Sequence, residues 1–326
     1  MDRHKKLRIV QIFVDPLLDL IRLLRPRAAL FGAGFDAFGQ WRLDFRKRDD
    51  LLFCWVEQGE FQLLRPGCEA VAMRPGDFAL IHTSTPFAFA SDASATAVDS
   101  EKAVAATRQV RLRLGSGTDR PVTLHAGKFL LEKANEALLA GLFPPVTHLA
   151  AGDSSLGRVR SLLAMNEMEA RQPGPASEFV IVRLVELILV EVLRAHPARL
   201  ADESKGLLAG LADPVTAKAL AALHGDVARE WSVDALAKLC HVSRSTFAGR
   251  FRAIVGMAPI DYLLNWRMAI AKDELSRGTK SVGAIAFDIG FQSPSAFTTA
   301  FTRVVGCPPT HFARQMEERR ARKRPA

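Results

Sequence analysis

The spacing of apolar side chains changes along the chain from a period of two to a helical period. From about residue 28 to residue 123, apolar and polar positions alternate over short segments, as in residues 41–45 (WRLDF). Alternation of this kind predicts β-strands with one buried face. Turns such as residues 65–67 (RPG) and 74–77 (RPGD) separate the segments. Many short strands joined by such turns favour a small antiparallel barrel or sandwich.

One part of this region lacks a clear period. Residues 90–107 are rich in Ala, Ser and Thr, and they show neither alternation nor helical spacing. They follow a predicted strand in which Phe87 and Phe89 share one face. We expect residues 90–107 to form a loop.

Beyond Pro145 the apolar positions recur with helical spacing. A first helix begins near residue 154 or 155, and a second begins at Ser177 after the turn at residues 172–175 (QPGP). Residues 179–193 are the most apolar run of the chain, but three charged residues interrupt the run, so we expect no membrane span. The apolar surface of this helix is too wide for one whole side to face water. Either the barrel or a second copy of the chain covers it, and we favour a homodimer contact through residues 155–195.

The C-terminal third is predicted to be all helical. Residues 198–212 are expected to form a linker, after which Asp213 provides a helix cap and Pro214 the first helical turn. The helical pattern then continues to about residue 313. An N-terminal β-domain with a helix pair and a C-terminal all-α domain together give an α+β fold class.

The C-terminal domain contains an internal repeat with a period of about fifty residues. The matched pairs are Ser243 and Ser293, Ser245 and Ser295, Phe247 and Phe297, Phe251 and Phe301, Val255 and Val305, Gly256 and Gly306, and Pro259 and Pro309. Further upstream the offset is forty-nine, so that Ser232 corresponds to Ser281. Similarity at a fixed spacing indicates one supersecondary unit used twice.

Each copy of the repeat has the parts of a helix-turn-helix. In the first copy, residues 233–239 form a bracing helix and residues 240–242 a turn before a second helix capped by Ser243. In the second copy, residues 282–287 form the bracing helix, Gly290 supplies the turn, and Ser293-Pro294 start the second helix. A single helix, residues 260–276, joins the copies. It would let both second helices enter successive major grooves, about 34 Å apart, on one face of a duplex.

The outward-facing residues of the two second helices are candidate DNA contacts. These candidates are Arg244, Ser245, Thr246, Ala248, Gly249, Arg250 and Arg252 in the first copy, and Gln292, Ser293, Ser295, Ala296, Thr299 and Arg303 in the second. The arginines of the first copy could all bind phosphate only, and for Arg252 we favour that role. Because the first copy is rich in Arg and the second in Ser and Thr, we expect an asymmetric DNA site in which the first copy contributes more of the affinity.

The formal charge of +9 is concentrated in the same part of the chain as the repeat. Residues 206–326 hold 17 Lys and Arg against 10 Asp and Glu, whereas residues 1–205 hold 27 against 25. This distribution is typical of a nucleic-acid-binding part joined to a nearly neutral one. A solvated terminal tail would give much the same excess, because five basic residues lie between positions 319 and 324. Charge therefore supports double-stranded DNA as the partner without establishing it.

The four cysteines are far apart and form no CxxC pair. Neither a zinc finger nor a disulfide framework follows, and we expect buried thiols in a reducing cytoplasm. The apolar stretch at residues 9–14 is too short for the hydrophobic region of a signal peptide. The sequence thus predicts a cytoplasmic protein.

Residues 214–314 resemble the DNA-binding domain of the AraC/XylS family of bacterial transcription regulators. The matching segments are residues 232–237 (SVDALA), 243–247 (SRSTF), Phe251, Gly256, Pro259, Arg267, residues 285–286 (IA), 290–293 (GFQS), 306–309 (GCPP) and Phe312. This ordered pattern covers about a third of the chain. The resemblance implies two helix-turn-helix units joined by a helix, and transcriptional control by promoter binding, with RNA polymerase as a further candidate partner.

The base-facing positions of the family correspond to small residues in this chain. They are Ser245, Ala248 and Gly249 in the first unit, and Ser295, Ala296 and Thr299 in the second. None can form a bidentate contact with guanine or adenine, which is worth about 1–3 kcal/mol of discrimination. The resemblance therefore implies modest direct readout, with Arg244, Arg250, Gln292 and DNA shape supplying further specificity.

The N-terminal half resembles the cupin-type sensor domain of one branch of this family. The supporting segments are residues 15–17 (DPL), 23–27 (LLRPR), 74–78 (RPGDF) and 142–148 (LFPPVTH). The resemblance implies a barrel that binds a small-molecule effector, and Phe53, Trp55, His82 and Phe87 are candidate pocket residues. It divides the chain into a sensor domain (1–150), a helical hairpin for dimerisation (151–197), a linker (198–212), a double helix-turn-helix domain (213–316) and a basic tail (317–326).

Enzymatic cupins hold a metal with clustered histidines and a glutamate. In this chain His82, His125 and His148 are separate and no HxH motif occurs, so we predict no metal, no cofactor and no enzyme activity. His82 then lines a pocket or is a hydrogen-bonded strand residue. A cupin-fold enzyme with a DNA-binding appendage is the least favoured function.

Two other functions fit the sequence. The first is a transcription regulator controlled by a small molecule in the barrel. The second is a regulator without such an effector, controlled by a protein partner or by its own abundance. A barrel core filled by Phe53, Trp55, Phe61, Phe87 and Phe89 would favour the second. The sequence does not separate the two.

Overall fold

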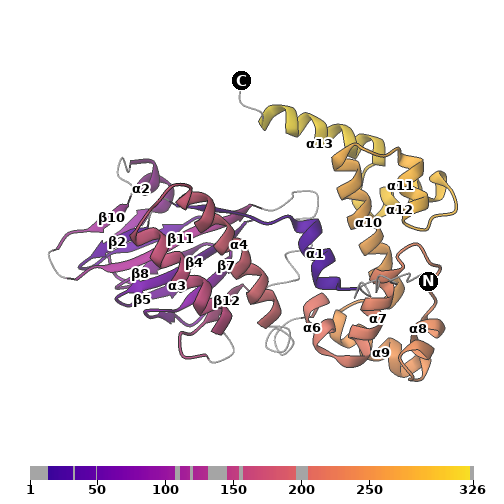
Figure 1. Cartoon of the computed structure of the whole chain (residues 1–326), viewed down its shortest axis with the longest axis horizontal. Coiled ribbons are helices and arrows are strands. Elements are labelled where there is room, and N and C mark those ends of the chain that lie inside the picture. The colour runs from indigo at the N-terminus through magenta and orange to yellow at the C-terminus, as the bar shows by residue number, and fades with distance from the viewer. Residues whose placement is uncertain are drawn as a thin grey trace, which may run out of the picture. The chain divides into compact units, whose positions relative to one another are not determined.

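The chain forms two compact units in the computed structural model (Figure 1), which describes residues 14–31, 34–48, 50–106, 111–117, 120–130, 145–153, 157–195 and 205–323. Residues 24–204 form one unit, which contains the strands and is called the sheet unit below. Residues 1–23 and 205–326 form the other, the helical unit. The predicted α+β fold class is confirmed.

The sheet unit contains two β-sheets. Its strands are β1 (Arg27–Leu30), β2 (Phe35–Phe38), β3 (Arg42–Phe45), β4 (Leu51–Gln58), β5 (Phe61–Leu64), β6 (Val71–Met73), β7 (Phe78–His82), β8 (Phe87–Ala90), β9 (Ala97–Asp99), β10 (Leu112–Gly115), β11 (Val122–Leu130) and β12 (Val146–Leu149). The larger sheet has the order β10-β2-β11-β4-β7-β12, with β1 also paired to β11, and the smaller sheet has the order β6-β5-β8-β3-β9.

The sheets form a sandwich, one of the two architectures that the strand pattern favoured, rather than the antiparallel barrel that the cupin-type resemblance implied. A hydrophobic core lies between them and includes Phe35 and Leu52 from the larger sheet and Leu43 and Phe89 from the smaller. Two strand pairs, β10 with β2 and β3 with β9, are parallel. Among the described residues each sheet keeps its own edge strands, so the hydrogen-bonded ladder does not close on itself.

Helices α3 (Gly157–Arg171) and α4 (Ser177–Ala195) cover the outer face of the larger sheet (Figure 1). Six apolar side chains of α4 are buried, namely Leu184, Val185, Ile188, Leu189, Val192 and Leu193. The Glu186 carboxylate accepts a hydrogen bond from the backbone N of Ala28 in β1 at 3.3 Å. Much of the apolar circumference of α4 is therefore covered within the chain.

Residues 97–106 form strand β9 and helix α2 (Ser100–Ala106), where the sequence predicted a loop. Asp99 explains the difference. Its Oδ1 accepts hydrogen bonds from the backbone N atoms of Glu101 and Lys102, both at 3.1 Å, and its Oδ2 binds Arg46 Nε at 2.7 Å. A capping aspartate can start a short helix in a stretch without apolar periodicity.

The helical unit contains α1 (Pro16–Leu24), α6 (Leu207–Ala212), α7 (Pro214–Gly225), α8 (Val233–Leu239), α9 (Arg244–Val255), α10 (Pro259–Arg277), α11 (Val282–Asp288), α12 (Pro294–Val305) and α13 (Pro309–Lys323). Two expectations need correction. The second half of the expected linker 198–212 is helix α6, because Leu207 and Leu208 are buried, and residues 198–204 lie outside the described residues. The expected tail 317–326 continues α13 as far as Lys323.

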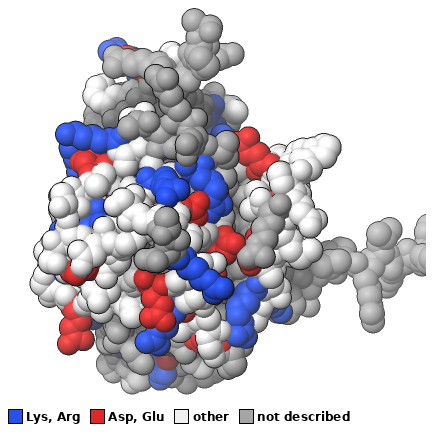
Figure 2. All heavy atoms as spheres, turned by 90° about the vertical axis from the view of Figure 1, so that its left-hand side faces the viewer, with Lys and Arg blue, Asp and Glu red and all other residues white. Residues whose placement is uncertain are grey.

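Charges of both signs are interspersed on the face of the sheet unit shown in Figure 2. This agrees with the nearly balanced count of basic and acidic residues in the first 205 positions. None of the helices in the described ranges is both long enough and apolar enough to cross a membrane.

Candidate nucleic-acid interface

The two predicted helix-turn-helix copies have matching local geometry. Helices α8 and α9 form the first copy, and α11 and α12 the second. A serine caps the second helix of each copy, α9 and α12, which are called the recognition helices below. Ser243 Oγ accepts a hydrogen bond from Thr246 N at 3.2 Å, and Ser293 Oγ accepts one from Ala296 N at 3.1 Å. Both helices end at a glycine with a left-handed backbone, Gly256 in the first copy and Gly306 in the second.

The buried skeletons of the copies also match. Phe247 and Phe251 are fully buried, with ring centroids 5.8 Å apart, and the rings of Phe297 and Phe301 lie 5.5 Å apart. An aromatic residue from the following helix then meets each pair edge-on. Tyr262 lies 5.9 Å from Phe251, and Phe312 lies 5.7 Å from Phe301. The sequence repeat is therefore a structural repeat.

The two turns share a left-handed backbone at one position but have different residues there. His241 and Gly290 occupy the corresponding position, and both have positive φ, at 57° and 85°. A Cβ on Gly290 would lie 2.1 Å from the carbonyl oxygen of Ala228, which no side chain could tolerate. Only glycine fits the second turn, whereas the first accommodates histidine at the cost of left-handed strain.

Most predicted contact residues are exposed. Phe247 and Phe297 face inward, as expected. The exposed candidates are Arg244, Ser245, Thr246, Gly249, Arg250 and Arg252 on α9, and Gln292, Ser295, Ala296, Thr299 and Arg303 on or just before α12. Ala248 and Ser293 are half-buried. Most of the predicted contact residues are therefore accessible on or just before the second helix of each copy.

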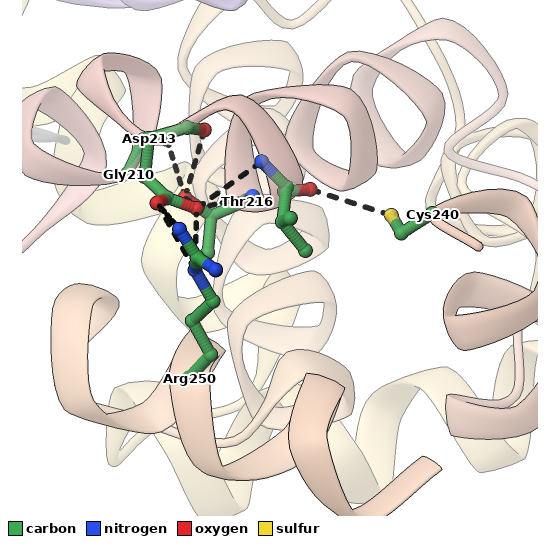
Figure 3. A network of polar contacts seen from close by, with 6 residues as sticks. Gly210, Asp213, Thr216, Cys240 and Arg250 are labelled. Carbon is green, nitrogen blue, oxygen red and sulfur yellow. Dashed lines mark hydrogen bonds and ion pairs between the residues drawn. The ribbon is translucent and has the colours of Figure 1, made fainter. Parts of the chain in front are cut away.

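Arg250 has a structural partner that the sequence did not indicate. Its Nε donates to both carboxylate oxygens of Asp213, at 3.1 and 3.0 Å, and its Nη2 also contacts Asp213 (Figure 3). Asp213 caps α7 by accepting from the backbone N atoms of Val215 and Thr216. Burial opposes ionisation of Asp213, but the hydrogen bonds from Arg250 and Thr216 outweigh it and lower its pKa. Arg250 therefore ties α9 to the start of α7.

The other arginines of the interface are less constrained. Arg244 pairs with Asp234 of α8 at 3.2 Å, and both side chains are more than half exposed. Such an exposed pair contributes little to stability, so Arg244 can exchange it for a contact with a nucleic acid. Within the ranges that the structure describes, Arg252 and Arg303 have no acidic partner. Their guanidinium groups are available to a nucleic acid backbone.

An N-terminal helix braces the first copy, a feature that the sequence did not reveal. Asp19 of α1 lies 3.2 Å from His224 Nδ1, and His224 Nε2 lies 2.8 Å from the Tyr262 hydroxyl. The His224 ring is buried and packs against the Trp266 ring, with the two planes tilted by 32° and the ring centroids 4.1 Å apart. Burial raises the pKa of Tyr262 far above its ordinary range, so its hydroxyl stays neutral. Partners 205 residues apart in the sequence leave no local signal.

The predicted effector pocket is not found as expected. Phe53 and Trp55 lie on the outer face of the larger sheet, where Phe53 packs against Phe129 at 4.8 Å. Phe87 faces the core between the sheets and stacks on Phe45 at 4.5 Å. His82 is half-buried, and its Nδ1 accepts a hydrogen bond from Ser84 N. The four candidates cannot line one cavity, because Phe53 and Trp55 share the outer face of the larger sheet whereas Phe87 lies in the core between the two sheets.

The other two histidines that we considered as metal ligands pair with carboxylates. His125 Nε2 lies 3.0 Å from Glu57, and His148 Nε2 lies 2.9 Å from Asp77. Burial lowers the pKa of His125 although Glu57 opposes the shift. Among the residues that the structure describes, no three His, Cys, Asp or Glu side chains are grouped as a metal site would need.

Comparison with known proteins identifies both parts of the chain. Residues 15–198 match the family model of the cupin domain, and residues 236–315 match that of a helix-turn-helix domain. Among solved structures, the DNA-binding domain of the global transcriptional factor AdpA, in complex with a target DNA, is 32% identical. The match covers 33% of this chain and 97% of that domain, with a TM-score of 0.32.

Two relatives match over nearly their whole length. An AraC-like transcription regulator of Streptomyces lividans is 36% identical, and one of Streptomyces antibioticus is 37% identical. Each match covers 92% of this chain and 98% of the relative. Both relatives are named as regulators rather than enzymes. This chain belongs to the AraC-like DNA-binding transcription regulators, with a cupin domain followed by a helix-turn-helix domain.

Proposed function

We propose that the chain recognises an asymmetric site on double-stranded DNA, with α9 and α12 in two successive major grooves. One observation carries the proposal: the copies share their buried aromatic skeleton but differ at nearly every exposed position of the recognition helices. Selection for folding alone would not require two solvent-facing surfaces of different chemistry. Two surfaces that contact different base sequences account for the difference.

The junction between the copies supports a fixed spacing. Arg267 of the connecting helix α10 donates hydrogen bonds to the carbonyl oxygens of Val227 and Arg229, both at 2.9 Å. Its guanidinium also lies 5.9 Å from the ring of Phe291 in the second turn. Helix α10 has 19 residues and is therefore about 28 Å long. That length is close to the repeat of the major groove, about 34 Å.

The exposed side chains divide into two roles in this proposal. Arg252 and Arg303 bind phosphates and set the position of each recognition helix, because both guanidinium groups lack an acidic partner among the described residues. Ser245, Ser295 and Thr299 are small and contact base edges or thymine methyl groups. DNA shape supplies the remaining discrimination.

We also propose that α3 and α4 form a contact with a second copy of the chain. Although one side of α4 is buried, four large apolar side chains on the two helices remain mostly exposed: Met165, Met168, Phe179 and Leu187. Exposed apolar side chains of this number on adjacent helices are typical of a protein interface. Sedimentation of the full chain tests this, and a monomer at micromolar concentration would refute it.

The DNA proposal is tested by fluorescence anisotropy with DNA fragments selected by the full-length protein. The affinity should fall steeply as salt rises, because phosphate binding releases counterions. Arg252→Ala and Arg303→Ala should each weaken binding and reduce the slope of log K against log salt by about one. Lys102→Ala, on the sheet unit, is the control and should change nothing. A flat salt response would refute the proposal.

A further inference from the structure

The sheet unit contains a pocket that differs from the one predicted from the sequence. It has a volume of about 220 Å³ and is lined by Phe31, Phe35, Phe45, Arg48, Ser100, Glu101 and Val104. Phe35 belongs to the larger sheet, Phe45 to the smaller, and the last three residues to α2. The pocket therefore lies where α2 meets both sheets.

The apolar wall of the pocket is held in place by packing. Phe35 and Phe45 are almost fully buried, at 2% and 4% exposure. The Phe45 ring stacks on Phe87 and meets Phe89 edge-on at 4.9 Å. A rigid aromatic wall favours a flat, apolar ligand because little side-chain entropy is lost on binding.

Two polar groups beside this wall lack hydrogen-bond partners. Among the described residues, neither the hydroxyl of Ser100 nor the Nε of Arg48 has one, although both atoms are buried. Ser100 is only 5% exposed. A buried donor without a partner is unfavourable, because it has lost its hydrogen bonds to water and gained none in the protein. A ligand that places a hydrogen-bond acceptor beside Ser100 and Arg48 would satisfy both groups.

The charge at the mouth of the pocket restricts the ligand further. Arg48 Nη2 already binds Glu101 Oε1 at 3.0 Å, so the pair is close to neutral. An anionic ligand would have to displace Glu101 or lie beside its carboxylate. An uncharged oxygen acceptor can instead bind Arg48 Nε and Ser100 while the ion pair stays intact.

The volume limits the size of the ligand. A cavity of about 150 Å³ lined by apolar side chains holds one benzene molecule. A pocket of about 220 Å³ therefore holds a single ring with a small substituent. We propose that this pocket binds a compact, uncharged aromatic carbonyl compound, with the ring against Phe35 and Phe45 and the carbonyl oxygen at Ser100 and Arg48. This inference goes beyond the proposed DNA recognition, because it adds a small-molecule ligand of the cupin domain.

Isothermal titration calorimetry on the full chain tests the inference with three probes of similar size. Acetophenone carries the carbonyl, ethylbenzene lacks it, and benzoate replaces it with a charged group. We expect saturable binding of acetophenone at one site per chain, with ethylbenzene and benzoate each about tenfold weaker. Equal binding of acetophenone and ethylbenzene, or no saturable binding of acetophenone, would overturn the inference.

Variants assign the binding to this pocket. Ser100→Ala should lower the affinity for acetophenone and leave the affinity for ethylbenzene unchanged. Glu101→Gln should raise the affinity for benzoate, because it removes the opposing charge. Val104→Phe should block binding of all three probes. Ile260→Phe, at an exposed aliphatic residue of α10 in the helical unit, is the control and should block binding of none. Unchanged acetophenone binding in both Ser100→Ala and Val104→Phe would place the site elsewhere. Circular dichroism of each variant checks that the fold is intact.

A DNA titration of the same preparation separates this inference from the proposed function. Salt-dependent DNA binding without any response to acetophenone would refute the ligand assignment alone. Acetophenone binding without salt-dependent DNA binding would support the pocket and refute the proposed DNA recognition.

Discussion

The two helix-turn-helix copies have the same buried aromatic residues but are supported by different parts of the chain. The first is held from outside the repeat, by Asp19 through His224 and by Asp213 through Arg250. The second copy is supported by ion pairs near its first residue, where Lys280 lies 2.8 Å from Asp288 and 3.7 Å from Glu274. A duplicated motif can therefore keep its core while each copy acquires its own supports and its own exposed surface.

The core comparison is tested by removing one aromatic side chain from each copy. Phe247→Ala and Phe297→Ala should each destabilise their own copy by about 3–5 kcal/mol, because both side chains are fully buried. Hydrogen exchange measured by mass spectrometry would show the loss of protection in α9 for the first variant and in α12 for the second. Normal exchange in either variant would show that the cores are not equivalent.

The turn comparison predicts opposite responses at corresponding positions. Gly290→Ala should destabilise the second copy, because the left-handed backbone alone costs about 1–3 kcal/mol and the new Cβ would collide with the Ala228 carbonyl. His241→Gly should leave the first copy as stable or make it more stable, since it removes the same backbone strain. Equal destabilisation by the two substitutions, measured by chemical unfolding, would contradict this difference.

The hydroxyl of Tyr262 distinguishes the first copy from the second. Tyr262→Phe should cost about 1–3 kcal/mol, because it leaves the buried ring nitrogen of His224 without its 2.8 Å partner. Phe312 fills the equivalent place in the second copy without a hydroxyl. Urea unfolding of the full chain measures the loss, and Tyr262→Leu, which also removes the ring, should cost more. An unchanged midpoint in Tyr262→Phe would show that His224 does not depend on this contact.

The smallest expected effect concerns pH and the first copy only. Asp213 has a lower pKa in the folded chain than its ordinary value of 3.8, despite its burial, because Arg250 and Thr216 bind its carboxylate. The ionised group therefore stabilises the fold above about pH 4, and this contribution is lost as the pH falls through the lowered pKa. Asp213→Asn should be less stable than the wild type at pH 6, and the difference should shrink as the pH falls through the lowered pKa of Asp213. A constant difference across this range would contradict the assignment.

Much of the helical unit could be predicted from the sequence. The repeat, the serine caps and the buried phenylalanines are local patterns with fixed spacing, so their positions follow from helix geometry. The contact of Asp19 with His224 and the pairing of Arg250 with Asp213 could not be predicted, because tertiary folding brings together residues that are distant in sequence. For this reason the sequence predicts Arg250 only as a DNA contact and gives no sign of its ion pair with Asp213.

The sheet unit was predicted less well. Alternation along the strands indicates which residues are buried. It does not indicate whether they face the second sheet or the covering helices, so the sequence led us to place Phe53 and Phe87 in one pocket. Both sides of β4 are buried, one under the facing sheet and the other under α3 and α4, and alternation cannot separate the two environments. Helix α2 was missed because its start depends on the single cap at Asp99.

The central claim is that the two copies contact different base sequences. Selection of bound fragments from random DNA by the full-length protein, repeated with Arg244→Ala and with Gln292→Ala, tests it most directly. We predict two different motifs about one helical turn apart for each bound chain, with Arg244→Ala relaxing one motif and Gln292→Ala relaxing the other. Two identical motifs per chain, or relaxation of the same motif by both variants, would contradict the account.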